Sequence, residues 1–323
     1  MTTMKKRIRI AAPLRAVHSA LTDPAALQVW LAEHAEVDLP DRYQFWGRFT
    51  PDGEAAHQRL RHVDDSSLRF DWELDGVATT VDIGLAAESG PGGDSGSTLL
   101  TLTQTEVPGW PEILTAAGDR SLMHTYWALA LANLADYAEG REPVARCDFT
   151  SAVLRGEMLI DADRLAVYAS LTEPEQFSRW SGVKVDAELH PGGRWAMGGF
   201  EANSEPAHIV DIQPGRSMSV DWGDMVQSWE LADSAGRTRL TFVHSGFDET
   251  QPPYDGWLGA LAGLAELRRY HEIKNWRPNV GRGTARRHPG RTPDNQLADG
   301  SQAATVRARK VMVQVAWCSG RRS

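Results

Sequence analysis

The chain contains 323 residues, carries a formal net charge of −9 and is 41% hydrophobic, which suits about two domains that each bury a core. No run of 18 apolar residues occurs, so we expect no membrane-spanning helix and no membrane partner. Charged residues and proline interrupt the basic N-terminus, so we expect no signal peptide and a cytoplasmic location.

The first half of the sequence predicts a strand, two short helices, several strands and one long helix. Residues 4–10 alternate as a strand does, Pro13 opens a short helix over 14–21, and Pro24 opens a second helix that ends near Trp30. Short alternating segments then predict an antiparallel meander at 43–50, 57–63, 67–74, 77–86 and 97–105. A helix of about five turns closes the half at 119–139.

The second half repeats the first. Four blocks align in the same order: ALTDPAALQVW (20–30) with SLTEPEQFSRW (170–180), SLRFDW (67–72) with SMSVDW (217–222), LLTLTQ (99–104) with RLTFVH (239–244), and WALALANLAD (127–136) with WLGALAGLAE (257–266). The offset is 150 residues in the first two blocks, 140 in the third and 130 in the last. Colinear matches of this kind indicate a duplicated domain. We therefore predict copy 1 at residues 1–142, a linker at 143–150 and copy 2 at 151–275.

The C-terminal segment, residues 276–323, differs from both copies in composition. It holds ten basic and two acidic residues, a net charge of +8, which leaves −17 for residues 1–275. Because so acidic a body repels nucleic acid, we expect no nucleic-acid partner. The segment is rich in Gly, Pro, Arg and Ser, so we interpret it as a disordered tail that adds little to stability.

One sheet covered by one long helix must curve around it, and the space between them becomes a pocket. Five segments of copy 2 resemble the START-like (SRPBCC) superfamily, and within it the activator of heat-shock-protein-90 ATPase homologues: LTEPEQFSRW (171–180), HPGGRWAMGGF (190–200), VDW (220–222), LTFVHSGF (240–247) and GWLGALAGL (256–264). The resemblance is weaker in copy 1, because DRYQFWGRF (41–49) and TQTEV (103–107) replace two of these segments. The resemblance implies an α+β fold of two tandem helix-grip domains, each a curved antiparallel sheet around a long C-terminal helix.

The pocket-facing positions give the candidate ligand-binding residues. In copy 2 we predict Arg194, Trp195, Phe200, Trp222, His244, Trp257 and Leu261, and in copy 1 the equivalents Trp46, Trp72, Trp127 and Leu131. Core packing is the alternative for the tryptophans on strands and on the long helices. For Trp30 and Trp180, at the ends of short helices, we expect core packing with the indole N–H bound to a carbonyl.

His244 is the one candidate for acid–base chemistry. It follows an alternating strand and precedes Ser245-Gly246-Phe247, which suits a hydrogen-bonding group or general base at the pocket mouth. The alternative is a histidine that fastens the strand end to the last helix. Copy 1 has Gln104 at this position, which cannot act as a base.

Motifs for metal, nucleotide or hydrolase chemistry are missing from the sequence. The two cysteines, Cys147 and Cys318, lie far apart in linker-like positions. No HExxH, CxxC, 2-His-1-carboxylate or G-x-S-x-G pattern occurs, and SGPGGDSGST (89–98) lacks the lysine of a phosphate-binding loop. We therefore expect no metal site and no cofactor.

Three hypotheses for function remain. The first is non-catalytic binding of an apolar small molecule, for sequestration, transport or resistance. The second is an enzyme of the polyketide cyclase or hydrolase type that uses His244, and the third is an interaction module that regulates a chaperone ATPase. The lack of an acid–base pair favours the first over the second, and no segment is similar to the additional chaperone-binding domain of the known activators. We expect copy 2 to be the working site, because bulky Tyr43, Phe45 and Trp46 occupy the matching hairpin of copy 1.

Overall fold

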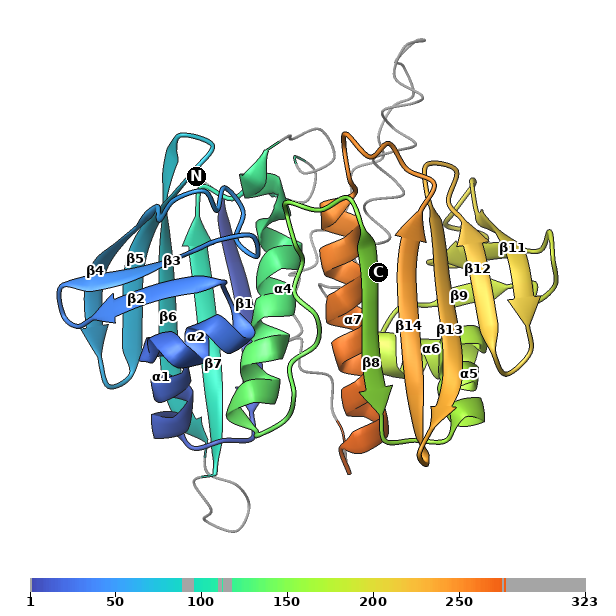
Figure 1. The fold of residues 1–323 in the computed structure, drawn as a ribbon, viewed down its shortest axis with the longest axis horizontal. Helices are drawn as coiled ribbons and strands as arrows, with labels where there is room; N and C mark the ends of the chain where they lie inside the picture. Colours follow the sequence, from blue (N-terminus) through green and yellow to red (C-terminus); the bar gives the residue numbers. More distant parts are fainter. Residues whose placement is uncertain (1, 89–95, 110–111, 113–117, 275, 277–323) are drawn as a thin grey trace, which may run out of the picture.

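The computed structural model describes residues 2–88, 96–109, 112, 118–274 and 276. Within these residues each half of the chain holds one large antiparallel sheet, two short helices and one long helix, which confirms the α+β class and the tandem helix-grip architecture (Figure 1). The predicted tail, apart from Trp276, lies outside the described residues. None of the described helices is long and apolar enough to cross a membrane.

Copy 1 follows the predicted order of elements. They are β1 (Thr3–Ile10), α1 (Leu14–Thr22), α2 (Pro24–Trp30), β2 (His34–Asp38), β3 (Arg42–Trp46), β4 (Gln58–Asp64), β5 (Ser67–Leu74), β6 (Val77–Glu88), β7 (Ser97–Thr105) and α4 (Asp119–Ala138). The five-stranded sheet has the order β1-β7-β6-β5-β4, and β2 and β3 form a separate hairpin. The short strand β2 was not predicted from the sequence.

Copy 2 repeats this order. Its elements are β8 (Leu154–Ile160), α5 (Arg164–Thr172), α6 (Pro174–Ser181), β9 (Val185–Ala187), β10 (Arg194–Met197), β11 (Ala207–Gln213), β12 (Ser217–Asp221), β13 (Val226–Ser234), β14 (Arg237–Ser245) and α7 (Tyr254–Glu272). Here the hairpin joins the sheet, so seven strands follow the order β8-β14-β13-β12-β11-β10-β9. Both copies also carry a register shift at the same place, after Leu60 in β4 and after Ile209 in β11.

Local sequence signals explain the helix pair at the start of each copy. Asp23 accepts a hydrogen bond from the Ala25 N–H at the start of α2, where Pro24 occupies the first turn. In each pair a tryptophan of the second helix hydrogen-bonds to the first helix. The Trp30 indole N–H donates to the Ala20 carbonyl at 2.9 Å, and the Trp180 indole N–H donates to the Ser170 carbonyl at 2.7 Å. Both tryptophans are therefore core residues of the kind that the sequence predicted.

The segment between the copies packs onto copy 1. Val144 and Cys147 are buried, and Asn133 of α4 both donates to the Val144 carbonyl and accepts from its N–H. Arg146 donates to the carbonyls of Gln28 and Ala32 at 2.7 Å. Residues 143–150 were expected to form a linker, with Cys147 in a linker-like position. The segment has no regular structure, but its backbone and side chains are anchored.

The long helices α4 and α7 lie side by side between the two sheets (Figure 1). Their contacts join equivalent positions of the repeat: Thr125 donates to Asp255 at 2.5 Å near the N-terminal ends, and Arg269 binds Glu139 at 3.0 Å near the C-terminal ends. The helices therefore run parallel, and an approximate two-fold axis relates the copies. Because each helix packs on its own sheet and on the other helix, all of residues 257–265 are buried.

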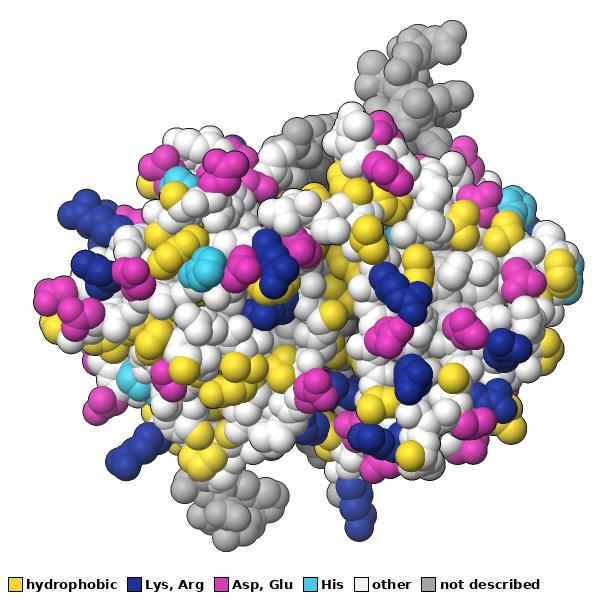
Figure 2. Space-filling view, in the orientation of Figure 1, with side chains coloured by type: hydrophobic (Ala, Val, Ile, Leu, Met, Phe, Trp, Pro, Cys, Tyr) yellow, Lys and Arg dark blue, Asp and Glu magenta, His cyan; other side chains and the backbone are white. Residues whose placement is uncertain are grey.

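The surface reflects this arrangement. On the face in Figure 2, hydrophobic side chains gather along the seam between the copies, and acidic and basic side chains are interspersed on both sides of it. Charges of one sign form no large patch among the residues coloured on this face.

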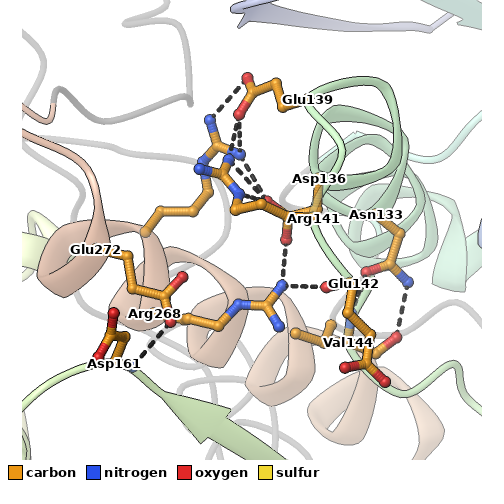
Figure 3. Close-up of polar contacts among 10 residues, drawn as sticks. Asn133, Asp136, Glu139, Arg141, Glu142, Val144, Asp161, Arg268 and Glu272 are labelled. Carbon is orange, nitrogen blue, oxygen red and sulfur yellow. Dashed lines mark hydrogen bonds and ion pairs between the residues drawn. The ribbon is translucent and has the colours of Figure 1, made fainter. Parts of the chain in front are cut away.

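A cluster of buried charges connects the C-terminal ends of α4 and α7 (Figure 3). Asp136, which is fully buried, accepts from Arg268 at 2.6 Å and from Arg269 at 2.7 Å. Arg269 also binds both carboxylate oxygens of Glu139, and Arg141 bridges Asp136 and Glu139 from the end of α4. Asp136 thus contacts two arginines of the other copy, and Glu139 supplies a second carboxylate to one of them.

We predict that Asp136→Asn lowers the free energy of unfolding by about 3–5 kcal/mol, because it leaves Arg268 and Arg269 buried without their shared carboxylate. Urea unfolding of the full chain measures this loss. The control is Asp38→Asn on the exposed hairpin of copy 1, which we expect to change stability by less than about 0.5 kcal/mol. Equal stability of the two variants would show that the cluster is not required for the fold.

Candidate functional site

A cavity of about 20 Å³ lies in copy 2, inside the concave face of its sheet. Its walls come from the short helices, the sheet and α7, and are formed by Leu171, Phe177, Trp180, Trp195, Met197, Trp222, Gln227, Trp229, Phe242 and Leu264. This volume holds about one water molecule, whereas pockets that bind small molecules usually measure about 300–1,000 Å³. A larger molecule therefore requires the walls to move apart.

Aromatic rings form most of the cavity wall. Phe177 lies 5.7 Å from Trp195, and Trp195 lies 6.2 Å from Trp229, measured between ring centroids. Trp229 is nearly parallel to Phe242 at 6.4 Å, and Phe242 is nearly parallel to Trp257 of α7 at 5.5 Å. These faces are suited to stacking against a flat apolar molecule.

Three positions of the matching region in copy 1 hold larger side chains. Ala35 pairs with Phe45 in copy 1, and Val185, at the repeat offset of 150, pairs with Met197 in copy 2, so Phe45 corresponds to Met197. The same register and offsets match Phe70 to Val220 and Tyr126 to Gly256. Copy 1 thus carries aromatic rings at three positions where copy 2 has smaller side chains, whereas copy 2 has Trp229 and Phe242 where copy 1 has Ile83 and Leu102.

These three rings surround Trp72 in copy 1. Phe45 lies 5.2 Å from Trp72 and Tyr126 lies 5.6 Å from it, while Phe70 lies 5.9 Å from Phe45. Trp127 completes the cluster at 6.1 Å from Trp72. Side chains therefore fill the space between sheet and helix in copy 1, and the smaller side chains leave a cavity next to Trp222 in copy 2.

His244 is buried beside the cavity, on β14. Its ring lies 5.1 Å from Phe242 and 5.2 Å from Trp257, and in the sheet it pairs with Gln227, a cavity residue. Neither ring nitrogen has a hydrogen-bond partner within the described part of the chain. Burial lowers the pKa of His244 from 6.5 to about 3, so the ring is neutral at pH 7.

The equivalent Gln104 of copy 1 is fully partnered. The Trp127 indole N–H donates to its Oε1 at 2.7 Å, and its Nε2 donates to the Thr79 hydroxyl at 2.9 Å. Thr79 in turn donates to the Trp72 carbonyl at 2.8 Å. Copy 2 has Met225 where the register places Thr79, so this chain of hydrogen bonds is not available to His244.

The match to a known protein family agrees with the duplication of the domain and with the fold of each copy. The family model described as activator of Hsp90 ATPase homolog 1-like protein matches residues 11–139 and 161–268, one segment in each copy. The chain belongs to this family. The resemblance seen in the sequence is therefore confirmed, and both copies are members of the Hsp90 ATPase activator homolog family.

Several solved structures are similar to the chain. CalU16 from Micromonospora echinospora is 23% identical over 44% of this chain and 76% of its own, with a TM-score of 0.33. An AHSA1-like protein from Rhizobium etli is 23% identical over 44% of this chain and 84% of its own, with a TM-score of 0.32. DynU16, described as a protein of the dynemicin biosynthetic locus, is 19% identical over 84% of this chain and 98% of its own, with a TM-score of 0.32. No curated protein matches the chain.

Of the predicted ligand-binding residues in this family member, Trp195 and Trp222 line the cavity. Trp257 and Leu261 are buried on α7, where both side chains face Gly156 of β8, behind the cavity wall formed by Phe242. Arg194 is exposed, binds Glu188 at 2.6 Å and lies over the Phe200 ring at 4.2 Å. Arg194 and Phe200 therefore form a surface cluster and do not line the cavity.

The predicted ligand-binding residues of copy 1 also divide into interior and surface positions. Trp72, Trp127 and Leu131 belong to the filled core, whereas Trp46 lies on the β2–β3 hairpin next to His34, at 5.5 Å. No metal-binding group of three or more His, Cys, Asp or Glu side chains occurs in the ranges that the structure describes.

Several cavity residues of copy 2 were not singled out from the sequence: Phe177, Met197, Gln227, Trp229 and Phe242. The alternation on β13 and β14 places Gln227, Trp229, Phe242 and His244 on one face, which is a signal for them. Phe177 has no such signal, because α6 reaches the cavity only through the packing of α6 against the hairpin.

We predict that His244→Gln makes copy 2 less sensitive to acid. The unfolded chain binds a proton at this histidine below pH 6.5, whereas the folded protein does so only near pH 3, so stability is complete above pH 6.5 and is lost as the pH falls. Between pH 7 and pH 4 the wild type should lose about 3 kcal/mol more than the variant, in denaturant unfolding at each pH. His208→Gln, at an exposed position of β11, is the control and should keep the wild-type dependence. Parallel pH profiles of all three proteins would refute the burial of a neutral His244.

Proposed function

We propose that copy 2 binds an apolar small molecule in its aromatic cavity without catalysing a reaction, and that copy 1 acts as its packed partner. Such binding serves sequestration, transport or resistance. The observation that carries the proposal is the replacement of Phe45, Phe70 and Tyr126 of copy 1 by Met197, Val220 and Gly256. The fold is the same in both copies, and at these three positions the side chains of copy 2 are smaller.

The hairpin β9–β10 is the wall best suited to move. Strand β10 carries Trp195 and Met197. It is attached to β11 by the ladder pairs of Arg194 and Trp195, and backbone hydrogen bonds join Gly192 and Gly193 to Ile209. Few ladder pairs attach this edge to the sheet, so it opens at lower cost than the central strands. In copy 1 the Gln58 side chain accepts from the Phe45 N–H at 3.1 Å and holds the matching hairpin in place.

The size of the expected affinity follows from the area that a ligand buries. An aromatic molecule that buries about 200 Å² of apolar surface gains roughly 5 kcal/mol, before the costs of association and of opening the wall. A gain of this size corresponds to a dissociation constant of about 0.2 mM before these costs, so we expect constants in the millimolar range for simple aromatic probes. Tighter binding requires a larger ligand or specific polar contacts.

The enzymatic alternative requires His244 to act as a base. A pKa of about 3 makes it a weak base at pH 7, and no carboxylate among the described residues hydrogen-bonds to its ring. The alternative of a chaperone-regulating module gains no support from a feature of the described residues. Binding without catalysis therefore has the better support.

We predict that Met197→Phe, which restores the residue of copy 1, weakens binding of the neutral dye N-phenyl-1-naphthylamine by at least about tenfold, because the ring fills the cavity. Dye fluorescence in titrations of the full chain measures the affinity, and thermal unfolding checks the fold.

The matched control is Phe45→Met in copy 1, which should leave the affinity for the dye unchanged. Failure of the wild-type chain to bind the dye, or unchanged binding by a folded Met197→Phe variant, would count against copy 2 as the binding site.

A further inference from the structure

We propose that the ligand of copy 2 is a flat aromatic molecule that carries a neutral hydroxyl group, and that His244 and Trp229 bind this hydroxyl. The inference rests on the proposed function and names the chemical class of its ligand. It is carried by buried polar atoms of these two side chains that have no partner in the described parts of the protein.

Three polar side chains lie together on the concave face of the sheet. Trp229 and Gln227 both line the cavity, and they are two residues apart on β13, so they point to the same side. His244 lies directly across from Gln227 on the neighbouring strand β14. Side chains opposite each other in an antiparallel pair are close enough to contact one molecule.

The unpartnered atoms are Nδ1 and Nε2 of His244 and Nε1 of Trp229, and all three are buried. Burying such groups without hydrogen bonds costs stability. His244 is the one described side chain with two such atoms, whereas a single unpartnered indole nitrogen also occurs in copy 1, at Trp72. Copy 1 shows the alternative at the same place in the fold, where Gln104 is held between Trp127 and Thr79. Copy 2 keeps a polar side chain at this position but lacks the internal partners.

The donors and acceptors define the missing group. A neutral histidine offers one N–H donor and one acceptor nitrogen, and the tryptophan indole offers a donor only. A hydroxyl group pairs with both side chains, because it accepts from Trp229 and either accepts from or donates to one ring nitrogen of His244. A carboxylate does not fit, because the residues that line the cavity include no lysine or arginine to neutralise it.

The aromatic part of the ligand follows from the wall next to these groups. Trp229 and Phe242 both line the cavity, and their ring planes differ by only 16°. Flat rings of similar orientation favour a planar molecule that stacks on them, and His244 lies at the edge of this stack, 5.1 Å from Phe242. The geometry therefore combines stacking faces with one polar end.

The test compares three probes of similar size on the full chain: 2-naphthol, 2-methylnaphthalene and 2-naphthoate. Intrinsic tryptophan fluorescence and calorimetry give the dissociation constants. We expect wild type to bind 2-naphthol about tenfold more tightly than 2-methylnaphthalene, and to bind 2-naphthoate more weakly than both. His244→Leu and Trp229→Phe should each reduce the preference for the hydroxyl, taken as the ratio of the two dissociation constants, to less than about threefold. His208→Leu, at an exposed position, is the control and should keep the wild-type preference.

The outcomes separate the two proposals. If wild type binds neither neutral probe, the proposed function is wrong and this inference falls with it. If wild type binds both neutral probes equally, copy 2 is a binding site, but the hydroxyl is not recognised. If the preference survives in folded His244→Leu and Trp229→Phe variants, another group binds the hydroxyl and the assignment of these two residues is wrong. His244→Phe, which keeps a flat ring but removes both ring nitrogens, serves in place of His244→Leu if that variant does not fold.

Discussion

The packing of α4 against α7 is the contact on which the rest of the molecule depends. Each helix covers the concave face of its own sheet and also buries its opposite side against the other helix, so neither copy exposes an apolar helix face. Two buried carboxylates of α4, Asp136 and Glu139, meet two buried arginines of α7, Arg268 and Arg269. Charges buried in this way add little net stability, but their loss on one side is costly. They therefore favour the register in which these four side chains meet.

This contact also constrains the binding site. Because α7 is held from behind by α4, the helix side of the cavity is the least free to move. Motion is then left to the opposite wall, where α6 and the hairpin β9–β10 carry Phe177, Trp195 and Met197. In copy 1 the same space is occupied by Phe45, Phe70 and Tyr126, which explains how one fold supports a packed core in one half and a cavity in the other.

The fold was largely predictable from the sequence, because each element occurs twice in the chain and its pattern can be compared between the copies. The alternation around Phe70 and Val220 gave the strands, and Pro24 and Pro174 gave the second helix starts. The site was less predictable. Periodicity assigns Trp229 and His244 to a face of the sheet, but not Phe177, which comes from a helix that reaches the cavity only after folding. Arg194 looked similar to its neighbour Trp195 in the sequence, yet alternation along β10 turns it outward to Glu188. The pairing of Asp136 with Arg268 and Arg269 depends on how the copies dock, and no pattern within one copy contains that information.

The parallel arrangement of α4 and α7 has a consequence for how such a chain can diverge. In a pair of identical subunits, a residue beside the two-fold axis faces its own copy, so any charge placed there meets the same charge. Joining the two halves in one chain removes this restriction, because each position is inherited separately. Glu139 and Arg269 occupy equivalent positions of the repeat and bind each other across the axis. Identical subunits can form no ion pair of this kind, so a change that returned either residue to match the other would place two like charges in the same buried site.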